Sequence, residues 1–115
     1  MTKTRSEHPV SYPLTGLKVL DLSRVLAGPF AGRMLSDLGA DVVKLEPPEG
    51  DVTRHWGVKR SGISGYYHQQ NAGKRNISVD LRQPEGAMVA KSLVAEADVV
   101  IENFRPGQLE RLIGP

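Results

Sequence analysis

Apolar residues change their spacing twice within the first 50 positions of this sequence, and the changes predict a strand, a helix and a strand. LKVLDL at residues 17–22 and DVVKLE at residues 41–46 are short runs rich in strand-forming side chains. The segment between them has apolar residues at the spacing of one helical face: Phe30, Ala31, Met34, Leu35 and Leu38. Pro29 suits the first turn of that helix, and Gly39 suits its end. We expect the apolar face of this helix to cover a sheet.

The second half of the chain repeats this alternation. NISVDL at residues 76–81 predicts a short extended segment, residues 84–97 have one apolar helical face, and DVVIE at residues 98–102 predicts another strand. A last short helix is expected after the NFRPG turn, within residues 107–113. Residues 47–73 show no clear period and are rich in glycine, proline and polar side chains, which is typical of a long functional loop.

This order of elements predicts an α/β fold, a Rossmann-like parallel sheet flanked by helices. A strand, a helix and a strand in close succession form a βαβ unit, whose strands pair in parallel through a right-handed crossover. Three or four parallel strands need helices on both faces, and only two full helices are expected here. We therefore expect an incomplete domain over residues 14–115, preceded by a flexible leader over residues 1–13.

Composition and charge exclude several classes of function. The chain has no cysteine, so disulfides and thiolate metal sites are impossible, and a cytoplasmic location is the default expectation. A net charge of +2 is too small to indicate a nucleic-acid or membrane partner. Residues 52–82, however, hold six basic side chains and one acidic one. This segment is either a solvated basic loop or a region that attracts a small anionic ligand.

The turn after the first predicted strand is a candidate binding site. Val25, Leu26, Ala27 and Gly28 occupy it. Small residues in such a turn let a ligand approach the backbone, and the free amides of a first helical turn attract anions. Alternatively, Gly28 and Gly32 only let the helix lie close to the sheet. The dinucleotide pattern GxGxxG is absent. Neither the histidines nor the acidic residues have the spacing of a catalytic group or a metal site.

Three blocks of sequence, taken together, are more specific than any single motif. They are PLTGLKVLDLSRVLAGPFAGRMLSDLGADVVKLEPPEGD, NAGKRNISVDLRQPEG and ADVVIENFRPG. In this order they closely resemble the amino-terminal part of the family III CoA-transferases, a group that includes formyl-CoA transferase, the carnitine CoA-transferases and α-methylacyl-CoA racemase. The resemblance extends from about residue 14 to residue 115 and implies that the AGPFAG turn flanks coenzyme A.

The resemblance also implies which residues contact coenzyme A. These are Leu26, Ala27, Pro47, Val79, Asp80, Leu81, Arg82, Asn103, Phe104, Arg105 and Arg111. The position of Pro47 is often basic in the family, so a charged contact is missing there. Guanidinium groups bind phosphate oxyanions with charge-assisted hydrogen bonds, and the three arginines are either such contacts or ordinary surface residues. Lys74 and Arg75 also match the family, and they either approach the ligand or order the loop.

The activity implied by the resemblance is transfer of CoA between an acyl-CoA and a carboxylic acid through an aspartyl intermediate, without a metal. In the family the nucleophilic aspartate lies beyond the position of Pro115, so we expect this chain to be a truncated copy or the CoA-binding part of a longer, interlocked homodimeric enzyme. Two alternatives remain at this point, an acyl-CoA racemase fragment and a non-catalytic CoA-binding or nucleotide-binding module.

Overall fold

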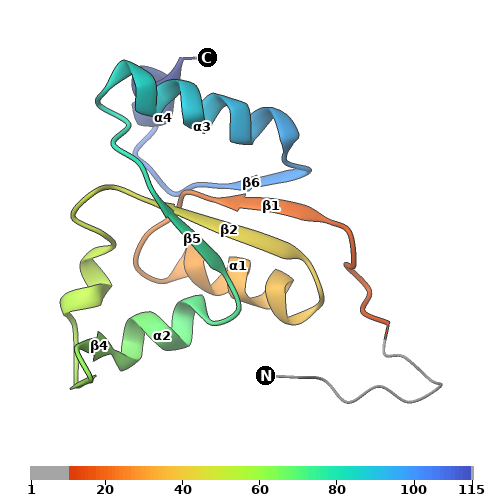
Figure 1. The fold of residues 1–115 in the computed structure, drawn as a ribbon, viewed down its shortest axis with the longest axis vertical. Helices are drawn as coiled ribbons and strands as arrows, with labels where there is room; N and C mark the ends of the chain where they lie inside the picture. Colours follow the sequence, from red (N-terminus) through yellow and green to blue (C-terminus); the bar gives the residue numbers. More distant parts are fainter. Residues whose placement is uncertain (1–10, 115) are drawn as a thin grey trace.

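Four parallel strands form the centre of the structure, a computed structural model that describes residues 11–114 (Figure 1). The strands are β1 (Lys18–Asp21), β2 (Asp41–Glu46), β5 (Arg75–Ser78) and β6 (Val99–Ile101), and they lie in the order β5-β2-β1-β6. Val19 of β1 lies opposite both Val42 and Val99. The strands β2 and β5 follow one another on one side of β1, and β6 lies on its other side. This is the strand order of a Rossmann fold. The predicted fold class is confirmed.

Helices cover both faces of this sheet. Helix α1 (Ala27–Asp37) and helix α2 (Gly65–Asn71) lie on one side, and α3 (Pro84–Glu96) and α4 (Gln108–Ile113) lie on the other (Figure 1). The core is correspondingly divided into two clusters. The larger one includes Leu20, Leu45 and Ala90 and packs under α3 and α4, while the smaller one includes Val19 and Val42.

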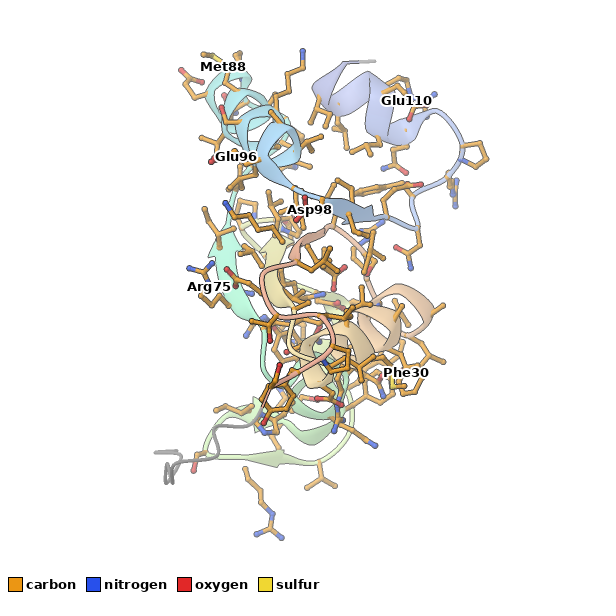
Figure 2. The ribbon with its side chains drawn as sticks, turned by 90° about the vertical axis from the view of Figure 1, so that its right-hand side faces the viewer. Phe30, Arg75, Met88, Glu96, Asp98 and Glu110 are labelled. Atoms are coloured by element: carbon orange, nitrogen blue, oxygen red, sulfur yellow. The ribbon has the colours of Figure 1, made fainter. Side chains whose placement is uncertain are left out.

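Most of the apolar stripe of α1 does not face the sheet, so this part of the prediction is largely wrong; of the stripe, Leu35 packs against the smaller core cluster. Phe30, Met34 and Leu38 are 50%, 48% and 44% exposed, and Figure 2 shows Phe30 on the outer side of the helix. The inner face carries Gly28, Pro29 and Gly32 instead. A Cβ at Gly32 would lie 2.8 Å from Oδ2 of Asp21, and one at Gly28 would overlap the side chain of Ser23. The alternative that the two glycines bring the helix close to the sheet is confirmed.

Residues 47–73 are more ordered than the sequence pattern indicates. They contain the 3-10 helix η1 (Val52–His55), a small antiparallel hairpin of β3 (Lys59–Arg60) and β4 (Ile63–Ser64), and helix α2. Polar caps begin these helices: the Asp51 carboxylate accepts from the Thr53 amide, and the Ser64 hydroxyl accepts from the Tyr67 amide. Short elements fixed by caps leave no apolar period in the sequence.

Of the predicted leader, residues 1–10 lie outside the described residues. The chain enters the sheet through a turn in which the Leu14 amide donates to the Leu38 carbonyl at the end of α1. Within residues 11–114, no helix has the length and apolar character needed to cross a membrane. The edge strand β6 leaves Val99 and Val100 more than one third exposed.

Candidate ligand site at the carboxyl ends of the strands

A hollow of about 400 Å³ opens where the segments that follow β1, β2, β5 and β6 meet. We call this hollow the crevice. Its lining combines apolar and charged side chains: Leu22, Arg24, Leu45, Pro47, Glu49, Gly50, Val52, His55, Asp80, Leu81, Arg82, Phe104, Gln108 and Leu112. Ligands of open α/β sheets bind outside the carboxyl ends of the strands, at the point where the strand order reverses. Here that point lies between β1 and β6.

Two further hollows adjoin the crevice. One, of about 330 Å³, is lined by the turn from Arg24 to Ala27 and by Asn103. The other, of about 560 Å³, is lined by Arg105, Arg111 and residues of α4. Arg24 borders all three hollows, and its guanidinium lies 5.4 Å from the centre of the Phe104 ring. The three hollows therefore form one basic, partly aromatic surface.

The structure brings most of the predicted site residues to these hollows. The crevice itself is lined by five of them: Pro47, Asp80, Leu81, Arg82 and Phe104. Three more line the hollow beside the β1–α1 turn: Leu26, Ala27 and Asn103. Arg105 and Arg111 line the third hollow. Val79 differs from the rest, because it lines none of the three hollows and is a buried member of the larger core cluster.

Arg82 is already paired in this structure. Its Nε lies 3.0 Å from Oδ1 of Asp80, whose carboxylate also accepts from the Arg82 amide. These hydrogen bonds hold the pKa of Asp80 below its ordinary value. Nη2 of Arg82 also donates to Oδ2 of Asp80, at 3.4 Å. A phosphate at the crevice would therefore compete with Asp80 for this guanidinium.

A buried ion pair lies between α1 and the sheet. Lys74 Nζ is 2.6 Å from Oδ2 of Asp21, and it also donates to the Pro29 carbonyl and the Asn71 side chain. Burial lowers the pKa of Lys74, while the hydrogen bond to Asp21 opposes that change. This geometry supports the interpretation that Lys74 orders the loop. Arg75 pairs instead with Asp41 at the opposite end of the strands, 2.7 Å apart.

Glu46 anchors residues 47–73 to the end of β2. Its carboxylate accepts from the Arg54 guanidinium, the Tyr67 hydroxyl, the Asn76 side chain and the Asp51 amide. Burial would raise the pKa of Glu46, but the hydrogen bonds, led by the one from Arg54, outweigh it and lower the pKa to about 2. Burial and Glu46 together raise the pKa of Tyr67. The position of Pro47 at the crevice depends on this cluster.

Sequence reasoning missed several residues that line the crevice, notably Arg24, His55 and Gln108. Arg24 could have been found, because it follows the first strand directly, at the end where ligands bind. The other two are brought in by η1 and α4, whose orientation no local pattern indicates. Within residues 11–114, no group of three or more histidine, aspartate or glutamate side chains is placed to hold a metal ion.

Comparison with known proteins gives consistent matches over this whole region. The sequence model of CoA-transferase family III matches residues 14–113. The chain is 52% identical over 101 residues to a succinate–glutarate CoA-transferase of Agrobacterium fabrum, covering 81% of this chain and 25% of that protein. It is 49% identical over 102 residues to a succinyl-CoA:glutarate CoA-transferase of Homo sapiens, covering 87% of this chain and 23% of that protein.

Solved structures agree with the sequence comparison. A CaiB/BaiF family protein from Brucella suis matches with a TM-score of 0.83 and 53% identity, over 88% of this chain and 28% of that one. A hypothetical protein from Mycobacterium tuberculosis matches with a TM-score of 0.82 and 40% identity, over 91% of this chain and 29% of that one. The chain spans about a quarter of the length of the curated relatives that it matches, so the α/β domain described above is a partial one.

Proposed function

The chain belongs to CoA-transferase family III, and on that premise we propose that the crevice binds the nucleotide part of coenzyme A. The protein would then take part in transfer of CoA from an acyl-CoA to a carboxylic acid. The name of one relative gives succinyl-CoA and glutarate as its substrates, and the name of another gives acetyl-CoA and oxalate. These names favour dicarboxylic acids as the class of acceptor.

The observation that carries the proposal is the set of arginines around the crevice and its neighbouring hollows. Arg24, Arg82, Arg105 and Arg111 come from three separate segments and meet on one surface. Coenzyme A carries a 3′-phosphate and a diphosphate, and guanidinium forks bind such groups with charge-assisted hydrogen bonds. Apolar side chains between them, including Phe104, suit the flat face of an adenine ring.

Individual roles follow from these positions. We assign the phosphates to Arg82 and Arg111, with the Asp80–Arg82 pair opening or rotating when the ligand binds. Leu26 and Ala27, in the turn before α1, would lie along the adenine side. The covalent step needs a carboxylate nucleophile, and the family resemblance puts that aspartate beyond Pro115. We propose that the residues described here supply binding and orientation for this step.

Calorimetric titration of the 115-residue chain with CoA and with dephospho-CoA tests the proposal. If an arginine binds the 3′-phosphate, its replacement by alanine should weaken the binding of CoA but not of dephospho-CoA. If it binds the diphosphate, the replacement should weaken the binding of both ligands. The expected loss is about 10- to 100-fold for Arg82→Ala or Arg111→Ala. Arg75→Ala is the matched control, because Arg75 is exposed and projects from the other end of β5 (Figure 2).

Two results would contradict the proposal. One is the absence of CoA binding by the folded parent chain, with folding checked by far-ultraviolet circular dichroism. The other is that Arg82→Ala and Arg111→Ala both bind CoA as tightly as Arg75→Ala does. The first result would refute the site as a whole, and the second would refute the assignment of the phosphate contacts.

A further inference from the structure

The turn between β1 and α1 contains a residue in a strained backbone conformation. Val25 has a φ of +75°. This region of backbone space is unfavourable for residues with a Cβ and most unfavourable for β-branched ones. Such a conformation persists only where surrounding contacts enforce it, and it is found most often at ligand sites. Val25 lies between Arg24, which borders all three hollows, and Leu26.

Asn103 holds the residue before Val25. Its side-chain Oδ1 accepts a hydrogen bond from the Arg24 amide at 3.0 Å, and its Nδ2 donates to the Arg24 carbonyl at 2.8 Å. Both polar atoms of the side chain are therefore engaged with the backbone of one residue. Asn103 follows β6 and Arg24 follows β1, so this reciprocal pair spans the point where the strand order reverses.

Asp51 holds Val25 itself. Its Oδ2 accepts from the Val25 amide at 3.3 Å and from Lys44 Nζ at 3.1 Å. Lys44 Nζ also donates to the Ser23 carbonyl at 3.0 Å, so the buried Lys44–Asp51 pair contacts the turn on both sides of Arg24. Burial would raise the pKa of Asp51, but the hydrogen bonds from Thr53 and the charge of Lys44 outweigh it and hold this pKa below its ordinary value.

We propose that Asn103 and Asp51 are positioning residues that hold Val25 at positive φ, so that Arg24, Leu26 and Ala27 face the ligand. This inference rests on the proposed function, and it changes the role of Asn103. The family resemblance implies that Asn103 touches coenzyme A, whereas the geometry has it act through the backbone of Arg24. A turn that is already in its binding conformation loses less conformational freedom on binding, which strengthens affinity.

The test uses Asn103→Ala in the 115-residue chain, because Asn103 is exposed and its loss leaves no buried charge unpaired. We call the contacts of Asn103 and Asp51 with the turn the clamp. Amide hydrogen exchange, measured by NMR, reports whether the clamp is formed in the absence of any ligand. Exchange at Arg24 and Val25 should become about tenfold faster or more, since a hydrogen bond and the strained φ are both lost. The matched control is Gln69→Ala, an exposed amide side chain on α2. Asn103→Asp keeps the acceptor for the Arg24 amide but loses the donor to the Arg24 carbonyl, so exchange at that amide should rise less than in Asn103→Ala.

Affinity for CoA then separates positioning from direct contact. Asn103→Ala should weaken binding about tenfold, in line with the free energy of one strained residue. Adding Val25→Gly should return the affinity to within about threefold of the parent, because glycine adopts positive φ without a steric penalty. A contact made by Asn103 itself would not be restored by this second change.

The outcomes are distinguishable. If the parent chain binds no CoA, the proposed function fails, and hydrogen exchange still shows whether the clamp exists. If the parent binds CoA but Asn103→Ala leaves exchange at Arg24 and Val25 unchanged, the clamp is refuted. If exchange accelerates and Val25→Gly restores no affinity, Asn103 contacts the ligand directly and the positioning role is wrong.

Discussion

Replacing Gly32 with alanine tests how closely α1 lies against the sheet. A Cβ at this position would lie 2.8 Å from Oδ2 of Asp21 and 3.2 Å from the Cε and Nζ atoms of Lys74. Ordinary contacts begin near 3.4 Å, so either the helix or the carboxylate has to move by about 0.6 Å. The Asp21 and Lys74 side chains are buried and paired at 2.6 Å, so neither moves without loosening the pair.

The expected size of the effect follows from three opposing contributions. Alanine in place of glycine within a helix stabilises by about 0.8 to 1 kcal/mol. Overpacking of a tight interior costs about 1 to 3 kcal/mol, and weakening a buried ion pair adds to that cost. We expect Gly32→Ala to lower the free energy of unfolding by about 1 to 2 kcal/mol, which corresponds to a fall in Tm of roughly 5 to 15 °C for a domain of this size.

Urea unfolding followed by circular dichroism measures this change. Gly65→Ala is the matched control, because a Cβ there would meet only the Val58 carbonyl oxygen at 3.7 Å. We expect its stability to stay within about 0.5 kcal/mol of the parent. If Gly32→Ala were as stable as Gly65→Ala, the close approach of α1 to β1 and the packing of the Asp21–Lys74 pair would both be wrong.

Three further predictions concern acid, association and catalysis. The pKa of Glu46 is lowered from 4.5 to about 2, so its stabilisation of about 3 kcal/mol is present above pH 4.5 and is lost as the pH falls towards 2; Glu46→Gln should remove this part of the acid dependence in pH-dependent urea melts. The exposed Phe30 and Met34 on α1 should promote ill-defined self-association, which Phe30→Lys with Met34→Lys should reduce in light scattering; a sharp parent monomer that melts cooperatively above roughly 55 °C would contradict this and favour a self-sufficient binding module. The 115-residue chain should show no CoA transfer and no acyl or CoA adduct by mass spectrometry, since it would supply binding without the nucleophile; turnover above background would refute this division of roles.

The four strands of the parallel sheet and three of the helices, α1, α3 and α4, could be predicted from the sequence because each has a local pattern. DVVKLE coincides with β2 residue for residue, and the apolar face of α3 is buried at Ala90 as expected. The orientation of α1 could not be predicted from hydrophobicity alone. Its larger apolar residues form a regular stripe, but the distance to the sheet is set by Gly28 and Gly32, where a Cβ would collide with Ser23 or Asp21.

The polar organisation of the site could not be predicted from spacing either. Asp21 pairs with Lys74 across 53 positions, and Asn103 bonds to Arg24 across 79. Such partners are brought together by the strand order, which a local period does not contain. The family motifs did identify the segments that converge on the crevice, but they gave no sign that Asn103 is engaged with the backbone of Arg24.

Chemical-shift mapping of the ¹⁵N-labelled 115-residue chain with CoA tests the central claim most directly. If coenzyme A binds at the carboxyl ends of the strands, the largest chemical-shift changes should occur at the amides of residues 24–27, 80–82 and 103–105. These changes should saturate with a single common dissociation constant. The amides near Lys18, Asp41 and Arg75, at the opposite ends of the strands, should stay unchanged. Changes that centre on those residues, or no saturable change in a folded chain, would contradict the proposed site.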